Sequence, residues 1–353
     1  MSTFNNYFQN KIYADQSVKE ALKKIDQLTN KSTLTLFVIN RQEQMVGTLT
    51  DGDIRRGLLK GKSIDDPIEK FMHTDYRFIP ADNFSVEQIK QFQKDEIGLI
   101  PKLDKDRKIV KIINLAERRS LLPMDVIIMA GGKGERLKPL TDHTPKPLLK
   151  VGDKPILEHN IDRLIEYGAE NFYLSINYLG EQIIDYFQTG QEKGITIHYI
   201  KENQPLGTIG AVSLVDNFHH DYALVMNSDI LTDIDFEDFF LHFLTNQSDL
   251  QVATTTYKVN VPYAVLEVAE NTIIAFQEKP TYTYYANAGI YLIKNSLLNL
   301  IPKNTFFNAT DLIELLIQKK YKITHFPILG YWLDVGKHED YKKAQEDIHY
   351  IKL

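Results

Sequence analysis

Apolar and polar residues follow two different patterns along the chain, and the change falls near residue 120. Before that point, short β-rich runs are separated by polar turns and by helical stretches such as SVKEALKKIDQL and SVEQIKQFQKD. Laying MVGTLTDGD (45–53) over IVKIINLAE (109–117) shows that the arrangement occurs twice, with a period of about 64 residues. Because neither copy can bury its apolar face alone, we expect the two to pack together as one α+β module over residues 1–120.

After residue 120, buried-strand patterns alternate with amphipathic helices. VIIMA, NFYLSIN, ITIHYI and YALVMNSD have the pattern of strands, whereas ILEHNIDRLIEYG and GEQIIDYFQTGQ have that of helices. Strands that alternate with helices of this length form βαβ units, which predicts an α/β domain with a mainly parallel sheet over residues 121–353. Ligands of such sheets bind at the carboxyl ends of the strands.

A loop at one of these strand ends is rich in glycine and in cations. VIIMA is followed by GGKGERLKPLTDHTPKP, which contains three glycines together with Lys133, Arg136 and Lys146. Glycines allow backbone N–H groups to close on an anion, and the cations add charge, so the loop is suited to phosphate. Its spacing matches neither the dinucleotide motif G-x-G-x-x-G nor the Walker motif. A plain glycine turn with solvated cations is the alternative.

Composition limits the classes of function. The chain has 353 residues, no cysteine and a formal net charge of -6. The lack of cysteine excludes disulfides and thiolate metal sites. No apolar run reaches membrane length and the N-terminus does not resemble a leader, so we expect a cytoplasmic protein without a membrane partner. The negative charge argues against a general nucleic-acid binder.

The segment VIIMAGGKGERLKPLTDHTPKPLLKVGDKPILEHNI resembles the signature of the sugar-1-phosphate nucleotidyltransferases. The likeness continues through ENQPLGTIGAV, VMNSDI, FQEKP, NAGIYLI and YWLDVGKHEDY, and so covers roughly residues 125–350. These enzymes join a nucleoside triphosphate to a sugar 1-phosphate and release pyrophosphate. The resemblance implies a Rossmann-like sheet and a role in making nucleotide sugars for cell-surface polysaccharides.

The tracts NYLGEQI and ENQPLGTIGA look most like guanylyltransferases acting on mannose or related sugar phosphates, and enzymes that couple this domain to a CBS pair resemble glucosamine-1-phosphate guanylyltransferases. The resemblance therefore favours GTP as the nucleotide. A UDP-, dTDP- or CDP-sugar pyrophosphorylase stays open, because the base is read by backbone groups. Two further alternatives are a catalytically inactive nucleotide sensor or scaffold, and a structural interaction module.

The resemblance also implies roles for individual residues. Two carboxylates at strand ends suit Mg²⁺, which binds a few carboxylates together with phosphate oxygens. Taken alone, each aspartate is more often a cap or turn residue. Asp229 and Asp334 are the expected metal ligands. The expected catalytic residues are Arg136, Lys146, Asp229 and Lys279. The expected nucleotide contacts are Ala130, Gly131, Gly132, Gly134, Glu202, Gly207 and Thr208. The expected sugar contacts are Tyr263, Glu278, Asn287 and Gly289.

The repeat over residues 11–118 is similar to a tandem pair of CBS domains, which bind nucleotides and regulate attached enzymes. GTLTDGD carries the pattern G-x-x-T-x-x-D, so Thr50 and Asp53 would contact a regulatory nucleotide. Asp53 is equally explained as the cap of the following helix. The second copy has Asn114 and Glu117 at the matching positions. Such pairs often associate face to face, which predicts a homodimer.

Overall fold

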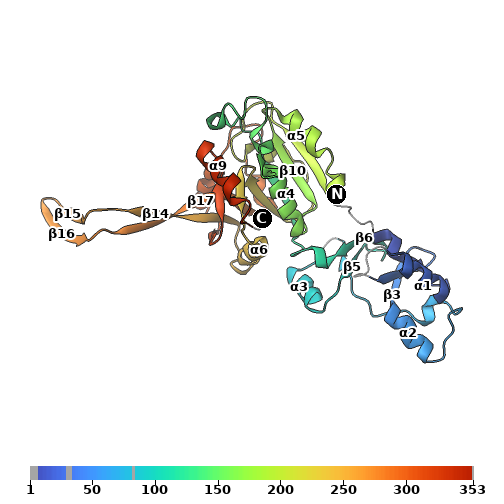
Figure 1. Ribbon diagram of the computed structural model, residues 1–353. Helices are drawn as coiled ribbons and strands as arrows, with labels where there is room; N and C mark the ends of the chain where they lie inside the picture. The colour runs from blue at the N-terminus through green and yellow to red at the C-terminus, as the bar shows by residue number, and fades with distance from the viewer. Residues whose placement is uncertain (1–6, 29–33, 82–83, 352–353) are drawn as a thin grey trace. The chain divides into compact units, whose positions relative to one another are not determined.

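The computed structural model describes residues 7–28, 34–81 and 84–351 of the chain (Figure 1). The chain divides into two compact units. Unit 1 comprises Met1–Pro123 and Glu166–Gly168, and unit 2 comprises Met124–Ile165 and Ala169–Leu353. The outermost residues of the two predicted domains, 1–6 and 352–353, lie outside the described residues. Each unit is described by itself.

Unit 1 contains one arrangement twice. In each half a short strand pairs in parallel with the strand that follows a helix, and this second strand pairs antiparallel with a third. The first half is β1 (Lys11–Tyr13), α1 (Val18–Gln27), β2 (Thr35–Ile39), β3 (Met45–Thr50) and α2 (Asp51–Leu59). The second half is β4 (Ile79–Pro80), α3 (Val86–Lys94), β5 (Leu99–Leu103) and β6 (Ile109–Asn114).

The two halves agree in detail as well as in order. Both antiparallel pairs contain a register shift, at Val38/Ile39 in the first half and at Lys102/Leu103 in the second, which is 64 residues further on. Both α1 and α3 begin after a serine, Ser17 or Ser85, whose hydroxyl accepts a backbone N–H of the first turn. The repeat that the sequence predicts is therefore present in the structure.

Unit 2 is built on a seven-stranded sheet with the order β11-β10-β7-β12-β17-β14-β18. Within the described residues, β17 alone runs opposite to its neighbours, so the expectation of a mainly parallel sheet is confirmed. The strands are β7 (Met124–Met129), β10 (Asn171–Ile176), β11 (Thr196–Lys201), β12 (Tyr222–Asn227), β14 (Leu250–Asn260), β17 (Thr281–Lys294) and β18 (Ile323–Pro327).

Helices cover the sheet with their apolar sides. In α6 (Phe236–Thr245) four phenylalanines recur at helical spacing and are all buried, which places the aromatic cluster DFEDFF in the core. The remaining longer helices are α4 (Ile156–Glu166), α5 (Gly180–Phe187), α8 (Ala309–Gln318) and α9 (His338–Asp347). Among the described residues, we find no helix that is both long and apolar enough to cross a bilayer.

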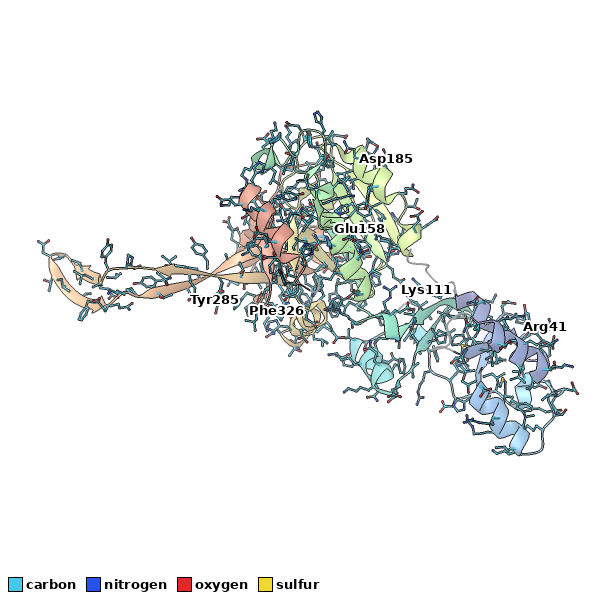
Figure 2. The ribbon with its side chains drawn as sticks, viewed as in Figure 1. Arg41, Lys111, Glu158, Asp185, Tyr285 and Phe326 are labelled. Carbon is cyan, nitrogen blue, oxygen red and sulfur yellow. The ribbon has the colours of Figure 1, made fainter. Side chains whose placement is uncertain are left out.

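Strands β14 and β17 continue past the sheet as a two-stranded ribbon that ends in the pair β15 (Val265–Ala269) and β16 (Thr272–Gln277) (Figure 1). We call residues 255–286 the arm. Tyr285 marks the root of the arm (Figure 2). The ring of Tyr285 lies 4.8 Å from that of His325. Beyond this contact, side chains stand out from both faces of the ribbon into solvent.

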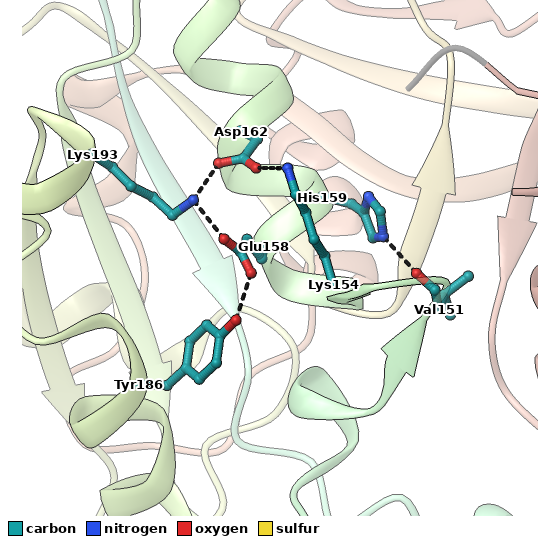
Figure 3. A network of polar contacts seen from close by, with 7 residues as sticks. All are labelled: Val151, Lys154, Glu158, His159, Asp162, Tyr186 and Lys193. Carbon is teal, nitrogen blue, oxygen red and sulfur yellow. Dashed lines mark hydrogen bonds and ion pairs between the residues drawn. The ribbon is translucent and has the colours of Figure 1, made fainter. Parts of the chain in front are cut away.

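Helix α4 is tied to its surroundings by a polar network (Figure 3). Lys193 Nζ donates to Glu158 (2.7 Å) and to Asp162 (2.6 Å), both of which belong to α4. Lys154 also pairs with Asp162 (2.7 Å), and the Tyr186 hydroxyl donates to Glu158 (2.6 Å). Burial lowers the pKa of Lys193, but its bonds to the two carboxylates outweigh this and raise it above 10.5. Burial and Glu158 raise the pKa of Tyr186 to about 12.

Lys193→Met should lower the free energy of unfolding by about 1–3 kcal/mol at pH 7, because it leaves two carboxylates facing each other on one helix. The raised pKa of Lys193 means that its contribution is complete below pH 10.5 and is lost as the pH rises through the folded-state value. The difference between wild type and variant should therefore shrink in strong alkali. Urea unfolding measures the free energy of unfolding of each variant, with Lys319→Met at an exposed position as control. An equal decrease in both variants would contradict the role of the network.

Candidate functional site

A pocket of about 570 Å³ opens at the carboxyl ends of β7 and β12. The loops after these strands stay attached to the sheet, since Ala130 N–H donates to Ser175 O (2.8 Å) and Ser228 N–H donates to Met129 O (3.2 Å). The pocket is lined by Met129, Gly131, Gly132, Lys133, Gly134, Glu135, Arg136, Lys146, Pro147, Asn177, Glu202, Pro205, Leu206, Gly207, Thr208, Asn227, Ser228, Asp229, Phe306 and Gly336. This is the sheet edge at which the sequence predicts a ligand.

The three glycines of the loop after β7 are needed for different reasons. A Cβ on Gly131 would lie 2.9 Å from Glu202 Oε1. Gly134 has a φ of 64°, and a Cβ there would lie 2.9 Å from a methyl carbon of Thr141. A Cβ on Gly132 would meet no heavy atom of the described residues within 4 Å, so Gly132 faces open space in the pocket. Folding therefore explains the first two glycines, and room for a ligand explains the third.

The preceding residue, Ala130, is predicted to contact the nucleotide but does not line the pocket. It is only 1% exposed and does not belong to the pocket lining among the described residues. Its N–H is already bonded to Ser175 O, so Ala130 fixes the start of the loop.

A small antiparallel pair of strands brings the two predicted metal ligands together. β13 (Ile230–Thr232) pairs with β19 (Trp332–Asp334), with Ile230 opposite Asp334, and Val335 N–H donates to Asp229 O (2.9 Å). The ammonium of Lys146, a residue only 9% exposed, donates to the Asp229 carboxylate and lies 4.0 Å from Asp334 Oδ1. Three charged side chains from distant parts of the sequence thus meet. Lys146 and Asp229 line the pocket, whereas Asp334 is not part of the lining among the described residues.

Asp334 is the less well compensated carboxylate of this cluster. Burial, and then the negative charge of Asp229, raise the pKa of Asp334 above its usual range, against the opposing effects of Lys146 and Arg136. Although 47% of the Asp334 side chain is exposed, its Oδ1 is buried and has no hydrogen-bond partner among the described residues. Such a site favours an added cation.

A cation at this site would need oxygens from elsewhere. Across the part of the chain that the structure describes, no group of three or more acidic or imidazole side chains is placed to hold a metal ion. Mg²⁺ is typically held by one or two carboxylates, with phosphate oxygens and water completing its shell. The pair Asp229 and Asp334 fits this type of site, and the cationic loop provides room for phosphate next to it.

Three of the predicted nucleotide contacts also hold the loops in place. The Glu202 carboxylate accepts the Ser175 hydroxyl and Leu206 N–H (2.9 Å). Thr208 uses its N–H for Asn308 Oδ1 (3.3 Å) and its hydroxyl oxygen for Ala309 N–H (2.9 Å). The third of these residues is Gly207, which has a φ of 79°. Glu202, Gly207 and Thr208 all line the pocket.

Gly207 is required by a neighbouring segment. A Cβ there would lie 2.6 Å from Phe307 O. Six hydrogen bonds between described residues join the loop 204–210 to the segment 304–309, among them Phe307 N–H to Leu206 O (2.9 Å) and Gly210 N–H to Phe307 O (3.0 Å). The two segments form one rigid rim of the pocket.

This rim presents an aromatic residue that the sequence reasoning missed. Phe306 belongs to the segment 304–309, lines the pocket and is 59% exposed. Pro205 and Leu206 line the same side. Nothing in the local pattern TFFNATD separates Phe306 from its neighbour Phe307, so only the fold could identify it.

Three of the predicted sugar-site or catalytic residues are not in the pocket. Glu278 and Lys279 follow β16 on the arm, and Tyr263 lies in the turn before β15 with 76% of its surface exposed. None of the three belongs to the lining among the described residues. The continuous pairing of β14 with β17, as far as Asn260 opposite Thr281, carries this part of the chain away from the sheet. The expectation that the three converge with Lys146 is therefore not met in this structure.

The two other predicted sugar contacts lie at the root of the arm, where the pairing register changes between Val252 and Thr254. Asn287 Nδ2 donates to the Tyr291 hydroxyl (2.8 Å), and its Oδ1 accepts Gly289 N–H (2.9 Å). A Cβ on Gly289 would lie 2.7 Å from Asn227 Nδ2, an atom of a pocket-lining residue. Asn287 and Gly289 thus shape a β-bulge that touches the pocket wall.

In unit 1, Thr50 and Asp53 form a capping box at the start of α2. Thr50 Oγ1 accepts Asp53 N–H (3.3 Å), and Asp53 Oδ2 accepts Thr50 N–H (2.9 Å). Burial alone would raise the pKa of Asp53, but its bonds with Thr50 and the Arg56 guanidinium hold it below its usual value. The cap interpretation accounts for both residues, and their contact with a regulatory nucleotide stays a prediction.

Comparisons with known proteins identify the family of this chain. A family model described as "Nucleotidyl transferase" matches residues 125–350, and a CBS domain model matches residues 11–60. The "Bifunctional protein GlmU" of Methanocaldococcus jannaschii is 36% identical over 230 residues, which are 63% of this chain and 54% of that protein. The mannose-1-phosphate guanyltransferase of Debaryomyces hansenii is 30% identical over 227 residues, 62% of either chain.

A solved structure is similar as well. The crystal structure of HddC from Yersinia pseudotuberculosis has a TM-score of 0.51 and 28% identity, and the match covers 64% of this chain and 99% of HddC. The chain spans only about half to three fifths of the length of the two curated relatives. Since the family model covers well over half of the sequence, the chain belongs to the nucleotidyl transferase family, with a CBS domain in its first part.

Proposed function

We propose that this chain transfers a nucleotidyl group from a nucleoside triphosphate to a sugar 1-phosphate, giving a nucleoside diphosphate sugar and pyrophosphate. The observation that carries the proposal is the pocket in which a cationic glycine loop lies beside Lys146 and Asp229, with Asp334 Oδ1 4.0 Å from the Lys146 ammonium. The family match and the name of the guanyltransferase relative support it.

In this reaction a phosphate oxygen of the sugar attacks the α-phosphorus, a new P–O bond forms, and the bond from that phosphorus to the bridging oxygen breaks. Pyrophosphate leaves with the electron pair. The attacking oxygen is already anionic at neutral pH, so the protein mainly aligns the groups and offsets their charge. We assign Lys146 to the reacting phosphates and Arg136 to the charge of the departing pyrophosphate.

Asp229 and Asp334 are proposed to hold Mg²⁺ when the nucleotide is bound. The cation would supply charge neutralisation at the phosphates. Lys146 keeps Asp229 in place through its hydrogen bond, and Gly132 leaves room for the phosphates to approach the backbone. These residues bind and orient the ligand and undergo no covalent change.

The base is proposed to stack on Phe306, between the rigid rim and the glycine loop, since an exposed aromatic face beside a polar pocket suits a nucleobase. The name of the mannose-1-phosphate guanyltransferase relative favours GTP. Tyr263, Glu278 and Lys279 are proposed to contact the sugar only when the arm that carries them lies against a pocket.

The first part of the chain, residues 1–120, is proposed to be a tandem CBS module that binds a regulatory nucleotide near Thr50 and Asp53, and residues 121–353 the catalytic domain, in a cytoplasmic enzyme. The CBS domain match over residues 11–60 and the repeated fold of unit 1 support the first of these assignments.

The direct test measures pyrophosphate release with Mg²⁺ across four nucleoside triphosphates and several sugar 1-phosphates, including those of mannose and glucosamine. One pair should be productive, and Asp229→Asn should reduce its turnover by about 100-fold or more, because a charge that acts on the phosphates is lost. Asp185→Asn, on the exposed side of α5, is the control. Nucleotide binding without turnover in any pair would favour a sensor, and absence of nucleotide binding a structural module.

The metal assignment has a test that does not depend on activity. Mg²⁺ and GTP together should raise the melting temperature of the wild type by more than the sum of their separate effects, and Asp334→Asn should remove this excess. Because the pKa of Asp334 is raised, its ionised form costs stability above pH 3.8, so the metal-free variant should melt at the same or a higher temperature. An undiminished excess in Asp334→Asn, with Asp185→Asn as reference, would refute the assignment.

The different surroundings of the glycines give a matched pair of variants. Gly132→Ala should leave the melting temperature almost unchanged and raise KM for the nucleotide by about tenfold or more, since the new methyl group occupies ligand space. Gly131→Ala should lower the melting temperature, because its Cβ would press on the Glu202 carboxylate. The opposite ranking in thermal unfolding would show that Gly132 is also needed for the fold.

A further inference from the structure

The segment GKHEDY, residues 336–341, forms the second half of the motif YWLDVGKHEDY and leads from β19 into the first turn of α9. The proposed reaction uses Asp334 of this motif but no residue after it. Gly336 is nevertheless buried and lines the pocket. Because glycine has no side chain, what matters at this position is the space that it leaves free.

The guanidinium of Arg136 lies in this space. An ideal Cβ on Gly336 would lie 3.2 Å from Arg136 Nη2, which is shorter than a normal van der Waals contact of a Cβ. Asp340 Oδ2, at 3.5 Å from the same point, would be in ordinary contact. A methyl group on Gly336 would therefore push the guanidinium away and leave Asp340 in place.

The backbone of Gly336 does not itself require glycine. Gly336 is not among the described glycines whose φ lies in the left-handed region, so a side chain here would cause no backbone strain. The group that it would displace is the end of a long, flexible side chain. Glycine at this position thus serves the placement of Arg136 and not the fold.

The side chain of Arg136 has no polar partner of its own. It is exposed, and no hydrogen bond or ion pair between described residues involves its guanidinium. Ordering an exposed arginine costs conformational entropy, and a group that acts on phosphate has to be held near its working position. The contact with Gly336 is the support that the structure provides.

The backbone next to Arg136 is fixed to the start of α9. Leu137 is fully buried and belongs to the same apolar cluster as Ala344 of α9. His338 Nε2 donates to Lys138 O (2.8 Å), and because a carbonyl only accepts, this nitrogen carries the proton. The loop that carries Arg136 is therefore anchored on the helix that follows Gly336.

The Asp340 carboxylate fixes Gly336 in turn. Its Oδ2 accepts Gly336 N–H (3.2 Å) and Lys337 N–H (3.0 Å). Gly336 N–H also donates to Asp334 O (2.8 Å). One short segment thus places both the carboxylate proposed to hold Mg²⁺ and the support of the Arg136 guanidinium.

We propose that Gly336 is a positioning residue for the nucleotidyl transfer. Its missing side chain lets the Arg136 guanidinium lie at the pocket wall, where pyrophosphate departs. His338 and Asp340 hold the two backbones that make this contact. The inference rests on the proposed function, because it takes the role of Arg136 from it.

Binding of pyrophosphate in the presence of Mg²⁺, measured by calorimetry on the full chain, tests the inference without turnover. Gly336→Ala should raise the Kd about tenfold, since a shift of less than about 1 Å in a charged group is enough for such a loss. Its melting temperature should stay almost unchanged. An unchanged Kd in this variant, or a wild type that does not bind pyrophosphate, would overturn the inference.

A double-mutant cycle separates the placement of Arg136 from other effects of the methyl group. Arg136→Ala should weaken pyrophosphate binding, and the addition of Gly336→Ala should cause no further loss, because no guanidinium is left to displace. If Gly336→Ala weakens binding equally in both backgrounds, Gly336 acts without Arg136 and the proposal is wrong.

Two variants of His338 test the link between the backbones. His338→Leu removes the bond to Lys138 O and should raise the Kd for pyrophosphate. His338→Gln keeps an N–H donor and should bind pyrophosphate as the wild type does. Equal affinities in the two variants would contradict the positioning role of this bond.

Turnover distinguishes a failure of the inference from a failure of the proposed function. With a productive substrate pair, Gly336→Ala should lower kcat about tenfold and leave KM for the sugar 1-phosphate unchanged, since Arg136 is assigned to charge on the departing pyrophosphate. A wild-type kcat would overturn the inference alone. Pyrophosphate binding that depends on Gly336, without turnover in any pair, would contradict the proposed function and support the placement of Arg136.

Discussion

The contact between the Lys146 ammonium and the Asp229 carboxylate is the interaction on which the arrangement of the pocket depends. It joins the segment after the glycine loop to the end of β12, and the pair β13–β19 adds Asp334 to the same place. One ammonium faces two carboxylates in a partly buried position. Lys146 and Arg136 do not offset the burial of Asp334 and the charge of Asp229, so a cation with its phosphate ligands is the natural complement.

The sequence predicts the pocket of unit 2 well where the motif is local. The glycine loop, Arg136, Lys146 and Asp229 lie together in one pocket, as the strand-end argument requires. The functions of Glu202, Gly207 and Thr208 are less visible in the sequence. They line the pocket, but their bonds to Ser175, Leu206, Asn308 and Ala309 depend on segments that only the fold brings near.

The sequence could not predict the direction of a long hairpin. The motif FQEKP has a local pattern, but whether Glu278 and Lys279 reach the pocket depends on how β14 and β17 leave the sheet, and this is set by a bulge that involves Ala288 and Gly289. Phe306 was missed for a related reason, because its position follows from hydrogen bonds to a loop about 100 residues earlier. In unit 1, by contrast, the period of the sequence predicts the repeat, and the structure repeats even the register shift of the antiparallel pair.

The bulge at Gly289 connects the arm directly to the pocket wall. Gly289 lies against Asn227, while the tip is separated from it by the whole length of the ribbon. Because the tip is far from the bulge, a small rotation at the bulge displaces the tip much further than it displaces the wall. Conversely, a contact that immobilises the β15–β16 pair would also restrict rotation at the bulge. It would thereby restrict the motion of the pocket wall at Asn227, far from the contact itself.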